Sequence, residues 1–368
     1  MKKISALMAA ALMLAACGKN SQDPGKDTQE PEENPPAAVQ TPGFAYGADI
    51  SWTSEMEAGG KVFKKQDGST ADIFDVLKDV GVNSIRLRVW VQPTGGWSGK
   101  EDVVALAVRA SRAGMALMID FHYSDFFADP SRQDFPSGWS ADKTDVDKTA
   151  GHIRAHTADI LGALKEAGVS PAWIQIGNET INGFLWPLGK IDWNSSAPWD
   201  NFVKLYNAGY ESAKELFPGA LVMPHLNNAF QDRAWWFKEL KQRGGKFDAM
   251  ALSHYPQTEA GKTPVQVNSE AISSIKKMMV EPTLAGLPVI IAEVGVKAGQ
   301  ESSSAAVLQA FMDEVRNLSV CKGVFYWEPE VYGGWKPAVY NTLGWGPYDM
   351  GAFTSDGRPS SIMNAFKH

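Results

Sequence analysis

Short apolar runs recur along most of the chain, and the stretches between them have helical periodicity. Eight of these runs have the length and composition of strands: 44–50, 84–90, 115–121, 172–177, 220–224, 249–254, 288–294 and 323–327. Between them apolar residues return every three or four positions, as at Ile73, Leu77 and Val80, which indicates amphipathic helices. Gly81 and Gly114 follow such stretches, and glycine there supplies the positive φ that ends a helix. The pattern predicts alternating strands and helices around a parallel sheet.

The number of β/α units points to one architecture. Eight units over residues 44–368 match the size of a TIM barrel. We therefore predict the α/β class, with a single (β/α)8 TIM barrel over residues 43–368. A doubly wound open sheet is the structural alternative. Its nucleotide-binding versions are disfavoured because neither a G-x-G-x-x-G motif nor a P-loop follows the first predicted strand.

The N-terminal segment differs from the rest of the chain and resembles an export signal. Lys2 and Lys3 precede an apolar run at 4–16, which is too short for a stable transmembrane helix. The run ends in Leu-Ala-Ala-Cys-Gly at 14–18, which resembles a bacterial lipobox. We predict a lipoprotein signal peptide at 1–16 and lipidation of Cys17; a plain secretory signal is the alternative.

Residues 17–42 have the composition of a flexible, disordered tether. The segment is rich in proline and acidic residues, and Val39 is its one sizeable aliphatic side chain, so it cannot bury enough apolar surface to fold. Gly18 rather than Asp follows Cys17. We therefore expect an exported protein anchored in the outer membrane through the lipid, facing the cell exterior. With Cys17 lipidated, Cys321 has no cysteine partner within the chain.

Composition narrows the range of ligands. The 368 residues carry a formal net charge of -7, which argues against nucleic acid as a partner because such proteins present a basic face. The chain is rich in aromatic residues, with 13 Trp, 9 Tyr and 17 Phe. Several Trp, including Trp139 and Trp199, stand in loop-like contexts, where exposed rings would stack on sugars; the alternative is that they fill the core. We expect a carbohydrate ligand and a monomeric protein.

Polar residues gather where the predicted strands end. In a barrel these ends meet on one face, and buried polar groups are costly unless they are paired or used. Every strand contributes: Asp49, then Arg86, Arg88 and Trp90, the run 120–125, Asn178 and Glu179, the run 225–228, His254 and Tyr255, Glu293, and finally Trp327 and Glu328. The clustering predicts the functional site on that face.

The residue types in this set favour carboxylate chemistry. The chain has no G-x-S-x-G nucleophile elbow, CxxC or H-E-x-x-H motif, and we expect no metal and no cofactor, although His122 with Asp125, or His225 with His254, imitate ligand pairs. Glu179 and Glu293 end strands on opposite sides of the barrel. Glycoside hydrolysis requires one carboxyl group to protonate the leaving oxygen and one to attack or to activate water. The pair predicts a glycosidase, with a separation of about 5–5.5 Å if it is retaining.

Four motifs carry a resemblance to a known family. Gly177-Asn178-Glu179 together with Glu293 is the pattern of clan A retaining glycosidases. The runs 47–51 (Gly-Ala-Asp-Ile-Ser), 86–90 (Arg-Leu-Arg-Val-Trp) and 122–130 (His-Tyr-Ser-Asp-Phe-Phe-Ala-Asp-Pro) are more specific. They resemble glycoside hydrolase family 53, the endo-β-1,4-galactanases, over essentially all of residues 44–368. The resemblance implies retaining, endo-acting cleavage of β-1,4-galactan, including the type I arabinogalactan side chains of pectin.

The resemblance also implies roles for single residues. Glu179 would be the acid/base, its pKa raised by the charge of Glu293, and Glu293 the nucleophile, kept ionised by Arg86. Asn178 would bind the sugar 2-hydroxyl, and Trp327 would form the floor of the cleavage subsite. The remaining substrate-binding residues implied are Asp49, Trp90, His122, His254 and Tyr255.

The chain departs from the family pattern at two positions, and two alternative functions remain. His254 stands where the family more often has Tyr, and Val294-Gly295 follow Glu293 where the family commonly has Thr-Gly-Trp. The loop at 296–304 has Glu301 as its one acid, so we expect no calcium there. The alternatives are another clan A endo-β-glycanase acting on mannan, xylan or glucan, and a non-catalytic surface glycan-binding lipoprotein.

Overall fold

The computed structural model describes residues 41–192, 197–337, 340 and 349–368. The predicted signal peptide, the lipidation site Cys17 and nearly all of the predicted tether lie outside the described residues, so their predictions stay untested. Among the described residues, no helix has both the length and the apolar content needed to cross a bilayer.

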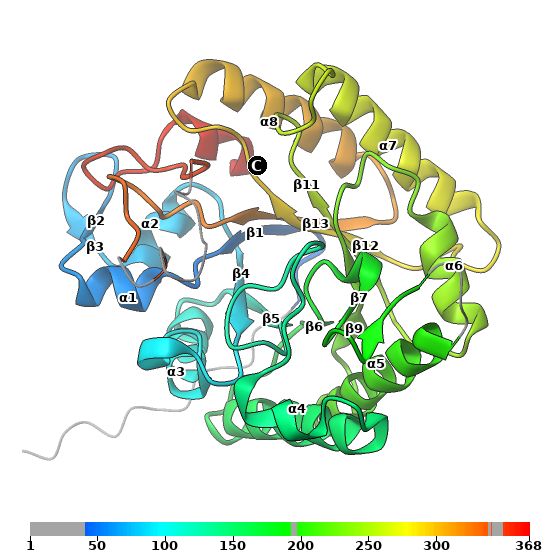
Figure 1. The fold of residues 1–368 in the computed structure, drawn as a ribbon. Helices are drawn as coiled ribbons and strands as arrows, with labels where there is room; N and C mark the ends of the chain where they lie inside the picture. Colours follow the sequence, from blue (N-terminus) through cyan, green and yellow to red (C-terminus); the bar gives the residue numbers. More distant parts are fainter. Residues whose placement is uncertain (1–40, 193–196, 338–339, 341–348) are drawn as a thin grey trace, which may run out of the picture. The chain divides into compact units, whose positions relative to one another are not determined.

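Nine parallel strand segments form a nearly closed barrel, in the order β10-β11-β12-β13-β1-β4-β5-β6-β9 (Figure 1). Their bounds are β1 Ala45–Asp49, β4 Ser84–Val89, β5 Ala116–Phe121, β6 Trp173–Ile176, β9 Leu221–Met223, β10 His225–Leu226, β11 Met250–His254, β12 Val289–Val294 and β13 Cys321–Trp327. The predicted α/β barrel is confirmed, and an open doubly wound sheet does not describe it.

The fifth predicted strand differs from the prediction because it is divided. Its two segments, β9 and β10, are the two ends of the sheet order and are separated by Pro224 alone. Proline has no N–H to donate to a neighbouring strand, but the Pro224 carbonyl still accepts from the Ala251 N–H at 3.1 Å. The chain at 221–226 therefore joins the β6 side of the sheet to the β11 side.

Helices surround the strands and alternate with them along the chain (Figure 1). They are α1 Thr53–Ala58, α2 Ile73–Asp79, α3 Lys100–Arg112, α4 Val146–Glu166, α5 Ala197–Leu216, α6 Ala234–Gln242, α7 Pro264–Val280 and α8 Glu301–Arg316. Within the described residues, four 3-10 turns stand between or after them: η1 Thr94–Gly96, η2 Ser137–Asp142, η3 Thr180–Asn182 and η4 Ser361–Phe366. Two short hairpins pair β2 Phe63–Lys64 with β3 Thr70–Ala71, and β7 Gly183–Phe184 with β8 Gly189–Lys190.

Local sequence signals account for several helix starts. The Asp72 carboxylate accepts the Phe74 N–H at 2.9 Å and caps α2. Thr263 and Gln266 form a reciprocal capping box at α7, and Pro264 occupies the first turn, where its missing N–H costs nothing. These caps satisfy N–H groups that a helix start leaves without a partner within the helix.

The barrel interior changes character along its axis. One group of buried side chains, which includes Met118, Trp173 and Phe325, forms a separate apolar cluster. Further along the same strands, at residues of the same inward-facing alternation, stand the buried polar groups Asp120 and Gln175. Apolar packing thus fills the interior toward the start of the strands and leaves the polar groups near their carboxyl ends.

Gly47 in β1 is required by this packing. A Cβ at this position would lie 2.1 Å from an atom of the Phe325 ring. We expect Gly47→Ala to lower the free energy of unfolding by about 1–3 kcal/mol, because an overpacked core forces side chains and backbone to shift. Gly151→Ala in α4 is the matched control, since its Cβ would have no neighbour within 4 Å. Chemical denaturation measures both, and equal stability of Gly47→Ala and the unsubstituted protein would contradict the packing described.

Candidate active site

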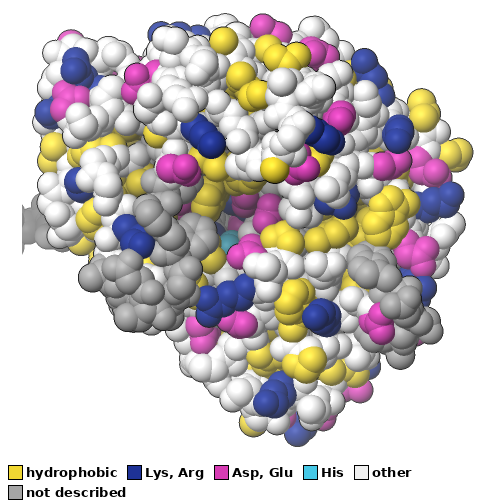
Figure 2. Space-filling view, turned by 45° about the horizontal axis from the view of Figure 1, so that its top comes forward, with side chains coloured by type: hydrophobic (Ala, Val, Ile, Leu, Met, Phe, Trp, Pro, Cys, Tyr) yellow, Lys and Arg dark blue, Asp and Glu magenta, His cyan; other side chains and the backbone are white. Residues whose placement is uncertain are grey.

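A pocket opens at the carboxyl ends of the strands. It is lined by His122, Phe127, Ala128, Asp129, Asn178, Glu179, Tyr255, Thr258, Glu293, Trp327 and Met350. Figure 2 shows a hollow on this face, with acidic side chains and a histidine inside it and hydrophobic side chains along its edge. The predicted clustering of polar strand ends is confirmed in this respect, because segments from five separate strand ends meet in one cavity.

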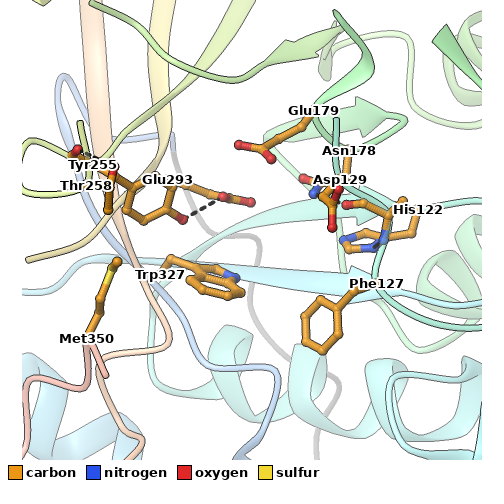
Figure 3. A pocket seen from close by; sticks show the side chains of 11 residues that line it. His122, Phe127, Asp129, Asn178, Glu179, Tyr255, Thr258, Glu293, Trp327 and Met350 are labelled. Atoms are coloured by element: carbon orange, nitrogen blue, oxygen red, sulfur yellow. Dashed lines mark hydrogen bonds between the residues drawn. The ribbon is translucent and has the colours of Figure 1, made fainter. Parts of the chain in front are cut away.

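Two glutamates face each other across the pocket. The Glu179 and Glu293 side chains point toward one another in Figure 3, and a carboxylate oxygen of each lies within 4.8 Å of the other. Inverting glycosidases hold their carboxyl groups about 6.5–9.5 Å apart, and retaining ones about 5–5.5 Å apart. The observed approach fits the shorter separation.

Glu293 is aimed into the pocket by an irregularity in the sheet. Leu252 pairs with Ile291, but the next residue, Ser253, pairs with Glu293, so β12 carries one extra residue here. Such bulges re-aim a side chain and occur often beside active sites. The bulge places Glu293 on the inward side at the level of Ser253.

Two contacts of Glu293 stabilise a negative charge on its carboxyl. Its Oε1 lies 2.9 Å from Arg86 Nη2, and its Oε2 accepts the Tyr255 hydroxyl at 2.7 Å, the bond drawn in Figure 3. Burial raises the pKa of Glu293, while the Arg86 guanidinium and the Tyr255 hydroxyl oppose that rise. Of the two glutamates, Glu293 is therefore the one built to hold the charge.

The surroundings of Glu179 favour its protonated form. Burial, and then the charge of Glu293, raise its pKa to about 8. The sequence suggested the charge of Glu293 as the cause of this rise, but burial is the larger cause. Its backbone has a left-handed φ of 49°, which is uncommon for a residue with a Cβ and occurs at sites where a side chain must be placed against local preference.

Arg86 lies at the centre of a buried polar cluster. Its Nη1 donates to Asp49 Oδ2 and its Nη2 to Asp120 Oδ2, both at 2.7 Å. Nη2 also lies 3.0 Å from Asn178 Oδ1. With Glu293 included, three carboxylates share one guanidinium that is 1% exposed, and their charges raise the pKa of Arg86 against the effect of burial. The cation is thus permanently charged and fixes both Asn178 and Glu293.

His122 and Trp90 extend this cluster. The His122 ring places Nε2 2.9 Å from Asp120 Oδ2, and its Nδ1 accepts the Ala128 N–H at 3.1 Å. Trp90 Nε1 approaches the same Nδ1 at 3.4 Å. Because Nδ1 accepts, the His122 proton is on Nε2 and bonds to Asp120.

One group of residues in the described part of the chain has the spacing of metal ligands. Glu179, His225 and Glu293 each offer an atom within 4.8 Å of the others. His225 Nε2 already pairs with Ser253 Oγ at 2.8 Å, and both Glu293 oxygens are engaged as described. A metal here would have to displace these bonds, and Arg86 would repel it.

The sequence model of Glycosyl hydrolase family 53 matches residues 45–366. The chain belongs to glycosyl hydrolase family 53. It is 30% identical over 341 residues to an arabinogalactan endo-beta-1,4-galactanase of Thermothelomyces thermophilus, covering 86% of this chain and 98% of that one. Among solved structures it resembles a fungal beta-1,4-galactanase (28% identity, TM-score 0.74, 88% of this chain and 99% of the other). It also resembles the GH53 catalytic domain of Ignisphaera aggregans (25% identity, TM-score 0.75, 90% and 98%).

The structure brings most of the residues implied by family 53 together. Glu179, Glu293, His122, Asn178, Tyr255 and Trp327 line the pocket, and Asp49 and Arg86 lie buried in contact with each other behind Glu293. Trp327 stands between Phe127 and Tyr255, each ring about 6.2 Å away and nearly perpendicular. Figure 3 shows its ring below the two glutamates, where a pocket floor would be.

Two of the implied substrate-binding residues are placed elsewhere. Trp90 is 1% exposed and packs against Phe126 and Phe127, so it supports the wall of the pocket from behind. His254 is fully buried, stacks on Phe311 of α8 at 4.1 Å and pairs with Asn268 of α7 at 2.7 Å. Strand alternation explains His254, because the inward-facing neighbours are Ser253 and Tyr255.

Other residues of this family 53 site were not singled out from the sequence. Gln175 Nε2 lies within hydrogen-bond distance of Asp120 and 3.1 Å from Asn178 Oδ1, and Ser253 contacts Glu293 at 3.3 Å. Asp129 and Met350 line the pocket. A polar residue inside an otherwise apolar strand, such as Gln175, is the signal that would have marked the first of these.

Proposed function

We propose that this chain hydrolyses internal β-1,4-galactosidic bonds of galactan, including type I arabinogalactan, with net retention of configuration. The proposal rests on one observation above all. Two carboxyl groups within 4.8 Å face one pocket in a member of family 53. Arg86 and Tyr255 contact one of them, Glu293, while burial and the Glu293 charge raise the pKa of the other. The substrate follows from the relatives, which are galactanases by name.

In the first step Glu293 is the nucleophile. Its carboxylate attacks the anomeric carbon and forms an ester, while the bond between that carbon and the leaving oxygen breaks. Glu179 gives its proton to the leaving oxygen, which its raised pKa makes available near neutral pH. Arg86 holds Glu293 ionised and oriented until it attacks.

In the second step Glu179 is the base. Esterified Glu293 no longer carries a negative charge, so one cause of the raised pKa of Glu179 is removed and its carboxylate is stabilised. Glu179 takes a proton from water, the water oxygen bonds to the anomeric carbon, and the ester bond breaks to release Glu293. Asn178, fixed by Arg86 at 3.0 Å, is positioned to bind the sugar 2-hydroxyl throughout.

The polymer is bound by a small set of rings and polar groups. Trp327 and Phe127 offer apolar surface for a sugar face, as carbohydrate sites commonly do. His122 and Asp129 offer polar atoms on the Glu179 side of the pocket (Figure 3). These contacts would place one galactose unit over Trp327 with its scissile bond between the glutamates.

Incubation with unbranched β-1,4-galactan tests the proposal. We expect a rapid fall in chain length, short galacto-oligosaccharides and no early monosaccharide. Proton NMR of the first products should show the β anomer, before mutarotation. Cleavage of mannan, xylan or glucan in place of galactan would change the assigned substrate but keep Glu179 and Glu293 as the catalytic pair. Binding without cleavage of any polymer would favour a glycan-binding protein.

We also propose that the protein is an exported, outer-membrane lipoprotein, with a signal peptide at 1–16, a lipidated tether at 17–42 and the catalytic domain at 43–368. The support is the lipobox-like sequence at 14–18 and the composition of the tether. Radiolabelled palmitate should enter the protein and be lost in Cys17→Ser. Protease treatment of intact cells should remove the domain if it faces outward, and light scattering should give the mass of a monomer.

A further inference from the structure

A buried hydroxyl contacts the proposed nucleophile in addition to Arg86 and Tyr255. Ser253 ends the inward alternation of β11 and is fully buried. Its Oγ lies 3.3 Å from Glu293 Oε2 and 2.8 Å from His225 Nε2. Ser253 also hydrogen-bonds to the Glu179 carboxyl, a contact that opposes the rise in the pKa of Glu179. The serine hydroxyl has one proton, so it can donate to only one of these three neighbours at a time.

His225 decides which neighbour receives that proton. The imidazole is fully buried, and burial together with the nearby Arg86 charge lowers its pKa well below the usual range, so the ring is neutral. A neutral ring carries its proton on one nitrogen. If it is on Nε2, His225 donates to Ser253, and the Ser253 proton turns to a carboxyl. Glu179 has a raised pKa and favours its protonated form, so the charged Glu293 is the stronger acceptor. If it is on Nδ1, Ser253 donates to His225, and Glu293 loses that bond.

The contacts of Nδ1 favour the first arrangement. The backbone N–H of Glu179 points at Nδ1 from 3.3 Å, and Gln175 Nε2 lies 3.0 Å away. An N–H can only donate, so both contacts require a lone pair on Nδ1. Asn178 Oδ1, at 2.9 Å from Nδ1, has a second lone pair beside the one that receives Arg86 Nη2, so it could accept a proton there. In that arrangement, however, the Glu179 N–H would lose Nδ1 as its acceptor.

We propose that Ser253 is a positioning residue for Glu293, and that His225, protonated on Nε2, directs the Ser253 proton onto Glu293 Oε2. The inference rests on the proposed function, in which Glu293 is the nucleophile. It links the two glutamates through one side chain, since His225 accepts from the backbone of Glu179 and donates toward the partner of Glu293. The carboxylate would then receive three donors: Arg86, Tyr255 and Ser253.

This bond acts on the charged state of Glu293. A hydrogen bond to a carboxylate lowers its pKa, and it stabilises the carboxylate that leaves when the ester is hydrolysed. In Ser253→Ala the acid limb of the plot of kcat/KM against pH should therefore lie at higher pH. Hydrolysis of the ester should also be slower. The other titratable or charged groups around Glu293 stay in place in that variant: Arg86, Asp49, Asp120, Glu179, His225 and Tyr255. Glu179 also loses its bond to Ser253, which raises the pKa of Glu179 and so acts on the alkaline limb of the profile.

Three variants test the role of the hydroxyl. We expect Ser253→Ala to raise the acid limb of kcat/KM on galactan by about one pH unit, and Ser253→Thr, which keeps a hydroxyl, to move it by less than half as much. Ser274→Ala is the matched control, because it also removes a buried serine hydroxyl. Ser274 lies in α7, away from the pocket, and its hydroxyl donates to the Gln231 carbonyl at 2.7 Å. Equal acid limbs in Ser253→Ala and the unsubstituted protein would overturn the proposal.

Two measurements without substrate separate this proposal from the proposed function. In protein with 13C-labelled glutamate carboxyls, the Glu293 signal, assigned with Glu293→Gln, should titrate at higher pH in Ser253→Ala. In unsubstituted protein, 15N NMR should find the His225 proton on Nε2; a proton on Nδ1 overturns the proposal even if no variant folds. Failure to cleave galactan, with both NMR results as expected, contradicts the proposed function alone.

Discussion

Glu179→Gln is expected to lower kcat/KM on galactan by about 10²–10⁴-fold, the range that general acid–base catalysis contributes. The amide keeps the size of the side chain but cannot give or take the proton. The unsubstituted enzyme should also lose activity above about pH 8, since burial and Glu293 raise the pKa of Glu179 to about 8 and only the protonated form is an acid. The variant should lack this alkaline limb.

Aryl galactosides with a good leaving group make the role of Glu179 specific. Such leaving groups need no protonation, so ester formation should survive in Glu179→Gln while its hydrolysis, which needs the base, becomes limiting. A burst of phenolate followed by slow turnover is expected. Glu293→Gln is the companion variant and should give no burst. A Glu179→Gln enzyme with near-normal activity on polymer would remove Glu179 from the mechanism.

The second large effect concerns stability and involves two carboxyls outside the pocket. Glu328 and Glu330 follow β13 and are both fully buried. Arg88 pairs with Glu328. Glu330 Oε1 accepts the Trp52 N–H at 3.3 Å, and its Oε2 has no hydrogen-bond partner among the residues that the structure describes. Burial is the main reason that the pKa of Glu328 rises to about 8 and that of Glu330 well above its usual range, with the Glu328 charge adding to the latter.

These raised values predict the sign of a pH dependence. Unfolded glutamates lose their protons near pH 4.3, whereas the folded protein keeps them to higher pH, so the free energy of unfolding falls as pH rises from about 5 to 8. Each group contributes up to about 1.4 kcal/mol per pH unit. Glu330→Gln removes one of them, so the free energy of unfolding should fall less between pH 5 and pH 8 in this variant than in the unsubstituted protein.

Thermal unfolding at pH 5 and pH 8 checks this expectation. Glu314→Gln, on the exposed side of α8, is the matched control and should leave the difference between the two pH values unchanged. If Glu330→Gln and the control change in parallel, the Glu330 carboxyl is not protonated in the folded state.

Hydrophobic periodicity was enough to predict the barrel, because each strand is a short apolar run that can be recognised from its own residues. Seven predicted strands have one counterpart each in the structure, and the remaining one, the fifth, is divided at Pro224. The pairing of Glu179 with Glu293 followed from barrel closure, since strand ends that are far apart in the sequence must meet. The contacts within the site did not follow, because they depend on register: a bulge at Ser253 and Glu293 leaves no trace in the residue types.

Composition was a weaker guide to binding residues. Trp139 and Trp199, which loop-like surroundings suggested as exposed stacking rings, are buried in the core at 8% and 3% exposure. His254 and Tyr255 were both expected in the site as the polar end of one strand, yet neighbours in a strand face opposite sides. Asp120 and Gln175 are buried partners of Arg86, and their importance follows from the fully enclosed cation, which no linear pattern reveals.

The extra residue in β12 limits how this site can be transferred to another protein. On a regular barrel strand, side chains point alternately into the barrel and toward the helices. A glutamate that is shifted by one position along such a strand therefore points toward the helices. A design that copies only the side chains would therefore lose the meeting of Glu293 with Ser253 and Tyr255. The unit to transplant is the pair β11–β12 with its offset intact, so the backbone of these two strands is as much a part of the active site as its two acids.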